Sequence, residues 1–263
     1  MLIRGAELAV EETGDASSPR TVVWGHGLTR SRRLEDVEPL LDLARLPARV
    51  VRYDARGHGE SSSPPDLAGY GWDELALDQL AIADELGVGR YVAAGASMGA
   101  ATALHAAVAA PGRIEALVLV IPPTGWETRA AQVELYDERA RLVESDGVEA
   151  VIEAGAAIAP PDPFRGDADH ERRRAEAMRS WDPSRLALVL RGAGRAQLPD
   201  RAAIASIDRP ALVLGWTGDP GHPTTTIDEL STLLPHAEVH VASTAADLAG
   251  WTDLTAAFLA ALR

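Results

Sequence analysis

The chain alternates between short apolar runs and longer segments in which apolar residues recur at spacings of three and four. The short runs have the length of buried strands, and the longer segments have the periodicity of helices that bury one face. Strands and helices that alternate with short connections predict an α/β fold with a mostly parallel, doubly wound sheet. The predicted strands span residues 2–12, 21–24, 48–54, 91–94, 114–121, 210–215 and 237–242, and the predicted helices span residues 34–46, 72–86, 100–110, 223–234 and 245–262.

One long segment departs from this alternation. Residues 124–205 combine proline-containing loops with helical periodicity and show no strong strand pattern. An all-helical insertion between two predicted strands divides the chain into a core domain, residues 1–123 and 206–263, and a helical insertion, residues 124–205. The helices predicted within the insertion span residues 127–145, 147–158, 168–180 and 183–195.

Ser97 lies in a tight turn between the strand at 91–94 and the helix at 100–110. The turn from Gly95 to Gly99 has the form G-x-S-x-G, in which small flanking residues tolerate a strained backbone. The N-terminus of the following helix favours negative charge that develops beside the serine. This context predicts a nucleophilic serine, and the alternative is a small-residue turn without chemistry.

The turn resembles the nucleophile elbow of the α/β-hydrolase superfamily. Two neighbouring segments share the resemblance: residues 25–28, Gly-His-Gly-Leu, are similar to the oxyanion loop, and residues 54–61 are similar to the D-x-R-G-x-G-x-S turn. The resemblance implies an oxyanion hole made by the backbone N–H groups of Leu28 and Met98. We expect His26, a candidate pocket residue, to shape this loop rather than to act as a base.

The resemblance extends to the catalytic acid and to the pocket. Residues 216–223 resemble the G-x-x-D loop that carries the acid of the triad, which implies this role for Asp219. The helical insertion resembles the family's cap, which covers the serine and shapes the pocket. Trp126 and Trp181 are candidate pocket residues, although each also fits the core of a cap.

The catalytic histidine of the family has no counterpart at its usual place. It normally lies between the last strand and the last helix, but residues 243–249 contain no histidine, and Asp247 falls near the expected position. A serine hydroxyl needs a base within hydrogen-bond reach, whereas a carboxylate beside Asp219 would place two like charges together. His222 is the candidate surrogate base. The alternatives are a structural role for His222 and a base at His240.

Composition narrows the partners and the chemistry. The net charge is −14 and all 25 basic residues are arginine, which argues against nucleic-acid or anionic-membrane binding and excludes Schiff-base chemistry on lysine. The chain has no cysteine, no H-E-x-x-H motif and no apolar run of 18 residues. We therefore expect no metal, no cofactor and no membrane span. With no signal peptide visible, we expect a cytoplasmic protein that acts on a small-molecule substrate, and the oligomeric state stays open.

Three functions are compatible with these observations. The first is a serine hydrolase that cleaves a small ester, lactone or thioester. The second is a cofactor-free lyase, cyclase or isomerase that uses the same pocket, because one fold hosts several chemistries. The third is a degenerate member of the family that binds a ligand without turnover, as the missing histidine suggests.

Overall fold

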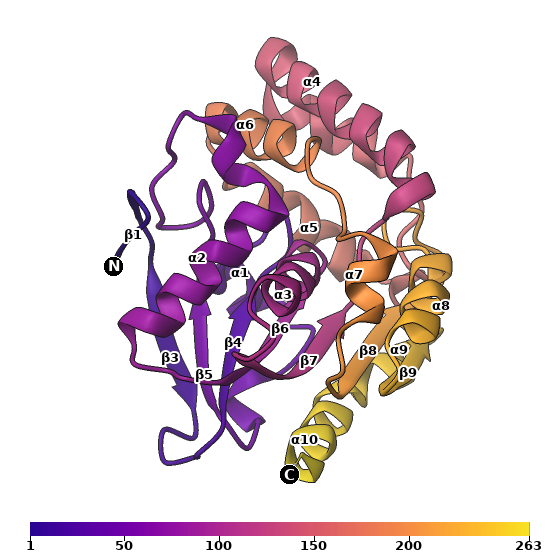
Figure 1. Cartoon of the computed structure of the whole chain (residues 1–263). Helices are drawn as coiled ribbons and strands as arrows, with labels where there is room; N and C mark the ends of the chain where they lie inside the picture. Colours follow the sequence, from indigo (N-terminus) through magenta and orange to yellow (C-terminus); the bar gives the residue numbers. More distant parts are fainter. Residues whose placement is uncertain (263) are drawn as a thin grey trace.

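The computed structural model describes residues 1–262 (Figure 1). Seven strands form one sheet in the order β3-β5-β4-β6-β7-β8-β9, and a separate pair forms near the N-terminus. Within the large sheet, β3 is antiparallel to β5 and the other pairs are parallel, as predicted. The strands are β1 (Leu2–Ile3), β2 (Ala6–Glu7), β3 (Val10–Gly14), β4 (Thr21–Gly25), β5 (Arg49–Tyr53), β6 (Tyr91–Ala96), β7 (Ile114–Val120), β8 (Ala211–Trp216) and β9 (Ala237–Ala242).

Helices follow most of the parallel strands. Among residues 1–262, every helix falls short of the length or the apolar content that crossing a bilayer requires. The helices are α1 (Arg32–Val37), α2 (Trp72–Glu85), α3 (Met98–Ala109), α4 (Arg129–Ala156), α5 (Ala168–Arg179), α6 (Pro183–Ala193), α7 (Arg201–Ala205), α8 (Thr224–Leu233), α9 (Ala245–Ala249) and α10 (Trp251–Ala261), with 3-10 turns η1 (Leu43–Arg45), η2 (Leu67–Tyr70), η3 (Trp126–Thr128) and η4 (Asp162–Phe164).

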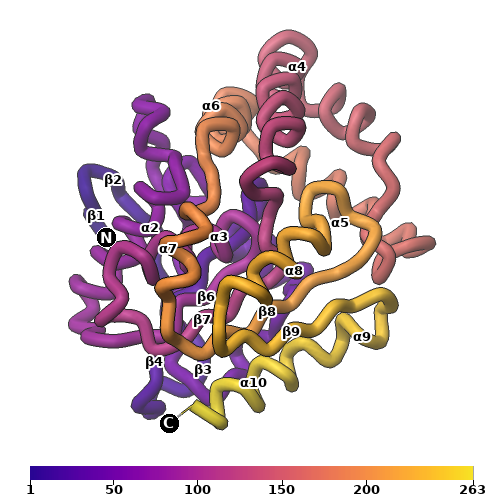
Figure 2. Tube along the Cα trace, turned by 45° about the vertical axis from the view of Figure 1, so that its right-hand side comes forward, coloured from indigo at the N-terminus to yellow at the C-terminus, as the bar shows by residue number. Residues whose placement is uncertain are grey.

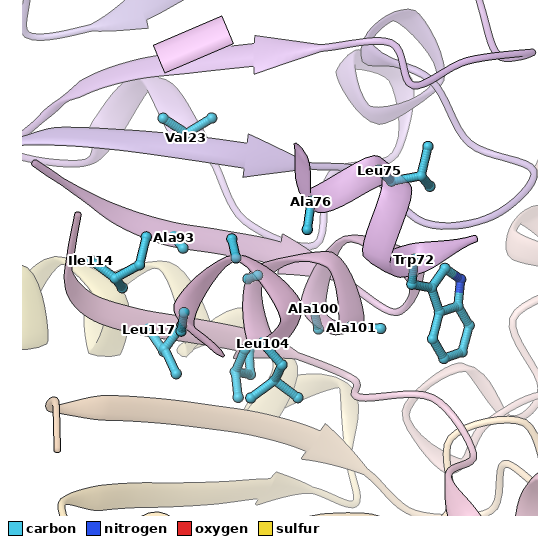
Figure 3. Packing of buried hydrophobic residues seen from close by; sticks show 14 of the residues in the cluster. Val23, Trp72, Leu75, Ala76, Ala93, Ala100, Ala101, Leu104, Ile114 and Leu117 are labelled. Carbon is cyan, nitrogen blue, oxygen red and sulfur yellow. The ribbon is translucent and has the colours of Figure 1, made fainter. Parts of the chain in front are cut away.

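Alternating side chains along the central strands divide the core into two layers. In β4, Val23 belongs to the layer that contains α2, α3 and α8, whereas Val22 and Trp24 belong to the opposite layer with α10. Figure 3 shows residues of the first layer, among them Leu104 of α3, Leu117 of β7 and Val23 of β4. Both faces of the sheet are therefore buried, which explains the uninterrupted apolar runs in the sequence.

The chain between β7 and β8 is helical, as predicted for the insertion. Figure 1 shows α4 and α6 packed together beyond one end of the sheet. Gly147, with a φ of 82°, kinks α4 into two arms. The insertion is tied to the loop after β5, because the Arg185 guanidinium donates to the carbonyl oxygens of Gly59 and Ser61. The domain boundaries at 123/124 and 205/206 stay predictions.

Two predicted helices are shorter in the structure. The helix predicted at 34–46 ends at Val37, because Pro39 disfavours helical geometry in the residue before it, and the chain resumes as the short turn η1. The segment predicted as one helix at 245–262 forms α9 and α10, which meet at Gly250. Apolar spacing thus identified the segments that pack on the sheet, while a proline and a glycine set the helix ends.

Replacing Glu35 with glutamine is expected to stabilise the protein by about 3 kcal/mol at pH 8 and to leave stability unchanged near pH 4. Burial raises the pKa of Glu35 to about 7, against a hydrogen bond from Trp24 Nε1 of 2.8 Å to its carboxylate. Between pH 4.5 and 7 the folded protein therefore binds more protons at Glu35 than the unfolded chain does. The free energy of unfolding consequently falls as the pH rises through this window. Urea unfolding at both pH values measures the difference.

Glu85→Gln is the matched control for this prediction, because Glu85 is an exposed carboxylate on α2. We expect this control to leave stability nearly unchanged at both pH values, as for most surface substitutions. An equal gain for Glu35→Gln at pH 4 and pH 8 would contradict the assignment, since a glutamine removes the ionisation penalty only where Glu35 would ionise.

Candidate active site

Ser97 occupies a strained backbone position at the junction of β6 and α3. Its φ of 51° and ψ of −107° are unusual for a residue with a side chain. Its N–H donates to the carbonyl oxygen of Val120 on the neighbouring β7 at 2.9 Å. A methyl group on Gly95 or Gly99 would collide with the backbone carbonyl of Gly25 in β4. Glycine at these positions therefore permits the close approach of β4, β6 and α3 that holds the turn.

The loop after β4 runs beside this serine. A Cβ atom built on Gly27 would lie 3.8 Å from the Cβ of Ser97, which brings the next residue, Leu28, to the elbow. Within residues 1–262, the backbone N–H groups of Leu28 and Met98 donate to no protein acceptor. Two unoccupied donors beside a serine are what an oxyanion hole requires, and this role stays a prediction.

His222 joins Ser97 to Asp219 through hydrogen bonds at both of its ring nitrogens. Nε2 lies 2.7 Å from Ser97 Oγ, and Nδ1 lies 2.7 Å from Asp219 Oδ2. When Nδ1–H donates to the carboxylate, Nε2 carries the lone pair that accepts the serine proton. The His222 and Asp219 side chains are 22% and 17% exposed. The structure thus brings the three predicted residues together, with an imidazole beside the serine and a carboxylate behind the imidazole.

Strand order explains why the histidine can come from this loop. Ser97 follows β6, whereas Asp219 and His222 follow β8, and β7 alone separates these two strands. With strands spaced about 4.8 Å apart, the loop after β8 starts roughly 10 Å from β6, and the loop after β9 starts roughly 14 Å away. A histidine after β8 is therefore closer to the elbow than one at the family's usual place.

Asp219 is held by three donors. Its Oδ1 accepts the Gly221 N–H at 2.8 Å, and its Oδ2 accepts Trp216 Nε1–H at 2.9 Å as well as His222 Nδ1–H. Burial alone would raise the pKa of Asp219, but the hydrogen bond and charge of His222, together with the other donors, lower it to about 2. Asp219 is therefore a carboxylate at neutral pH. Our sequence reasoning missed Trp216, although a tryptophan at the strand end three residues before the acid was visible.

His26 is a buried residue of the loop after β4, and backbone groups contact both of its ring nitrogens. Its Nδ1–H donates to the carbonyl oxygen of Gly27 at 2.8 Å, and its Nε2 accepts the Ala55 N–H at 3.0 Å. Burial lowers the pKa of His26, so the ring is neutral. These contacts leave no lone pair for proton transfer, and the expected loop-shaping role of His26 stays a prediction.

Asp247 falls near the place of the family's histidine in the sequence and is a candidate pocket residue, but within residues 1–262 its side chain makes no hydrogen bond to Ser97 or Asp219. It is exposed in the first turn of α9, which lies at the outer edge of the molecule beside β9 (Figure 2). Its Oδ2 accepts the N–H groups of Ser243 and Thr244 at 3.0 and 2.9 Å, and these hydrogen bonds lower the pKa of Asp247. Asp247 therefore caps a helix, because its carboxylate satisfies amides that the helix leaves unpaired.

The two candidate pocket tryptophans occupy different places. Trp181 follows α5, and its Nε1–H donates to the carbonyl oxygen of Thr29 in the oxyanion loop at 3.3 Å. Trp126 begins the insertion, where its Nε1–H donates to Pro199 O at 3.1 Å and the Arg201 guanidinium lies 4.5 Å from its ring centre. Trp181 thus contacts the loop beside Ser97, whereas Trp126 joins the two ends of the insertion. A pocket role for either residue stays a prediction.

Known proteins resemble this chain in sequence. A family model described as the alpha/beta hydrolase fold matches residues 21–143. "Putative carbamate hydrolase RutD" from Variovorax paradoxus (strain S110) is 30% identical over 197 residues, which are 73% of this chain and 71% of that protein. The sn-1-specific diacylglycerol lipase ABHD11 of Mus musculus is 34% identical over 113 residues, which are 43% of this chain but only 36% of the lipase.

A solved structure reproduces the fold over the whole chain. The enol-lactonase from Burkholderia xenovorans LB400 superposes with a TM-score of 0.81 and covers 99% of both chains at 23% identity. At this identity the likeness shows the fold alone, whereas the relatives found by sequence carry the names of hydrolases. With one relative aligned over more than two thirds of both chains, this protein belongs to the alpha/beta hydrolase fold family.

Proposed function

We propose that this protein is a serine hydrolase that cleaves a small ester, lactone or thioester. In this proposal Ser97 is the nucleophile, His222 the general base and Asp219 the orienting acid. The observation that carries the proposal is the continuous chain of hydrogen bonds from Ser97 Oγ through both nitrogens of His222 to Asp219. Such a partner is what turns a weak serine hydroxyl into a nucleophile near neutral pH.

The chemistry proceeds in two acyl transfers. Ser97 Oγ attacks the acyl carbon while its proton passes to His222 Nε2, and His222 then protonates the leaving alcohol or thiol. Water attacks the resulting acyl-serine, gives its proton to His222, and Ser97 leaves with that proton. Asp219 stabilises the imidazolium that forms in each transfer, because its low pKa keeps it ionised.

The loop after β4 stabilises the negative charge that develops on the substrate's carbonyl oxygen. The carbonyl oxygen of the substrate becomes an oxyanion in both tetrahedral intermediates, and the N–H groups of Leu28 and Met98 donate to it in this proposal. Met98 is the first residue of α3, so the helix dipole adds to the stabilisation.

The geometry favours hydrolysis over the two other functions that the sequence left open. A ligand-binding protein without turnover was considered because the usual base is missing, but His222 provides a base 2.7 Å from the serine oxygen. A lyase or isomerase forms no acyl-serine, whereas the hydrogen bonds that link Ser97 through His222 to the half-buried carboxylate of Asp219 suit a serine that attacks an acyl carbon. The hydrogen-bonded triad therefore supports covalent acyl transfer.

Reaction with a fluorophosphonate tests the proposal directly. We expect the native protein to gain one adduct by intact mass, and peptide mapping to locate it on Ser97, because a triad activates one serine selectively. Ser97→Ala and urea-unfolded wild type are the controls, and neither should be labelled. An adduct on another serine, or none on the native protein, would rule out Ser97 as the activated nucleophile.

Replacing Trp181 with phenylalanine is expected to lower kcat about fivefold with little change in KM, as for a lost hydrogen bond of about 1 kcal/mol. Phenylalanine keeps an aromatic ring against His58, whose ring centroid lies 5.3 Å away, but removes the donor to Thr29. Thr29 has a φ of 65°, so the loop beside Leu28 is strained and depends on such contacts. Steady-state kinetics with a p-nitrophenyl ester separate kcat from KM.

Trp126→Phe provides the matched control for this positioning role. It removes a comparable indole donor, to Pro199, at the far side of the insertion. We expect the control to lower thermal stability slightly and to leave kcat unchanged. Equal effects of the two variants on kcat would mean that Trp181 acts through general stability rather than through the oxyanion loop.

A further inference from the structure

One loop carries both the carboxylate and the imidazole of the candidate triad. Residues 217–223 join β8 to α8, contain Asp219 and His222, and form no helix or strand of their own. The contact between Asp219 and His222 lies within this β8–α8 loop, whereas the 2.7 Å contact from His222 to Ser97 joins two distant segments. An irregular loop keeps one conformation only when contacts from outside offset the entropy of fixing it. The position of the loop therefore decides whether the imidazole meets the serine.

Asp162, in the turn η4 of the helical insertion, makes two hydrogen bonds to the first residue of this loop. The Asp162 N–H donates to the carbonyl oxygen of Thr217 at 2.9 Å, and Thr217 Oγ1 donates to Asp162 Oδ2 at 2.6 Å. The hydrogen bond from Thr217, followed by that from Arg165, lowers the pKa of Asp162, so the acceptor is a carboxylate at neutral pH. Together, the backbone bond and the charge-assisted side-chain bond fix η4 against the start of the loop.

The next residue of the loop fits closely against the same carboxylate. Gly218 has a φ of 79°, and a Cβ atom built on it would lie 2.6 Å from Asp162 Oδ1. Glycine at this position permits both the left-handed backbone and the close approach of Asp162. Because Thr217 and Gly218 directly precede Asp219, these contacts hold the part of the loop from which the triad residues extend.

An aromatic contact joins the same turn to the triad. Phe164, also in η4, meets Trp216 edge-on, with ring centroids 5.6 Å apart. Trp216 donates through Nε1–H to Asp219 Oδ2 at 2.9 Å, and its ring lies 6.0 Å from the ring of His222. The turn η4 thus contacts the loop at its backbone and also packs on the indole behind the carboxylate.

We propose that Asp162 is a positioning residue, which holds the β8–α8 loop so that His222 Nε2 stays within reach of Ser97 Oγ. The inference rests on the proposed hydrolase function, and it gives the helical insertion a part in activating the serine. When the loop shifts, His222 and Asp219 move together and keep their own contact, but the imidazole leaves the hydroxyl. A displacement of about 1 Å at reacting groups can cost roughly 100-fold in rate, so a contact outside the triad can affect catalysis strongly.

Asp162→Ala is expected to lower kcat for a p-nitrophenyl ester about tenfold and to leave KM nearly unchanged, because the loop is freed while Ser97 stays in place. The rate constant for inactivation by a fluorophosphonate should fall by the same factor, since that reaction depends on the same activated serine. Asp162→Asn keeps an oxygen that accepts from the Thr217 hydroxyl and should react within about twofold of wild type. A loss through general stability would not separate kcat from KM in this way.

Arg165→Gln is the matched control, because Arg165 pairs with the other oxygen of the same carboxylate and its side chain is 67% exposed. This control removes a charge partner of Asp162 but none of its contacts with Thr217, and it should leave kcat unchanged. Thr217→Val should reproduce the loss of Asp162→Ala, and the double variant should be little slower than either single variant. Wild-type kcat in Asp162→Ala, or losses that multiply in the double variant, would overturn the inference while leaving hydrolysis by Ser97 intact.

Hydrogen exchange followed by mass spectrometry tests the positioning role without catalysis. The N–H groups of Gly221 and His222 donate within the loop at 2.8 and 3.2 Å, so their exchange reports how well the loop is ordered. We expect Asp162→Ala to speed exchange in this loop about tenfold and Arg165→Gln to keep the wild-type rate. This result would support the hold of Asp162 on the loop even if wild type hydrolysed no ester and took no fluorophosphonate, an outcome that would reject the hydrolase proposal alone. Unchanged exchange in Asp162→Ala would reject the positioning role.

Discussion

Replacing Ser97 with alanine and replacing His222 with alanine are expected to lower kcat for a short-chain p-nitrophenyl ester by the same factor, roughly 10,000-fold. The reason is that the two side chains act as one unit through the 2.7 Å contact between His222 Nε2 and Ser97 Oγ. Without the imidazole the hydroxyl keeps its proton, and without the hydroxyl the imidazole has no nucleophile to activate. The double variant should therefore be no slower than either single variant.

Two controls distinguish a relocated base from a general loss of structure. His240 hydrogen-bonds Glu238 at 2.7 Å on the last strand, and Asp247 caps α9, so His240→Ala and Asp247→Ala should retain kcat within about threefold. Circular dichroism should show native folds for all variants. Retained activity in His222→Ala would reject His222 as the base. If His240→Ala lost activity at the same time, His240 would be the base instead.

The fold could be predicted because its determinants are local. Runs such as 116–121 are apolar at every position, and this pattern is typical of a strand that is covered on both sides of a sheet. The turn at Ser97 was equally visible, because G-x-S-x-G specifies a geometry that depends on Gly95, Gly99 and the strand that precedes them. The structure adds that Gly25 on β4 is the backbone that these glycines must accommodate.

The histidine beside Ser97 was harder to predict because its place depends on distant parts of the chain. The sequence offered His222 and His240 without showing which loop comes near the elbow, and that depends on β7 alone lying between β6 and β8. The surroundings of Asp247 could not be predicted for the opposite reason. Its position matched the family's pattern, but the local hydrogen bonds of a capping box decide where its carboxylate points.

Replacing Asp219 with asparagine is expected to lower kcat by roughly 1,000-fold to 10,000-fold while KM changes little. The carboxylate accepts from Gly221 on one oxygen and from Trp216 and His222 on the other. An asparagine has one acceptor and one donor, so either orientation sets its NH2 group against an N–H donor. If the NH2 group faces His222, Nδ1 must accept and Nε2 must carry the proton, which leaves no lone pair for Ser97.

The alternative orientation keeps the His222 contact but removes the negative charge that stabilises the imidazolium, so kcat falls in that case as well. Asp247→Asn changes an equally charged but distant carboxylate and should leave kcat unaltered. Trp216→Phe removes one donor to Asp219 and should lower kcat only severalfold, because His222 and Gly221 still hold the carboxylate. If Asp219→Asn retained wild-type kcat, Asp219 would position the loop without supporting a base, and the triad would reduce to Ser97 and His222.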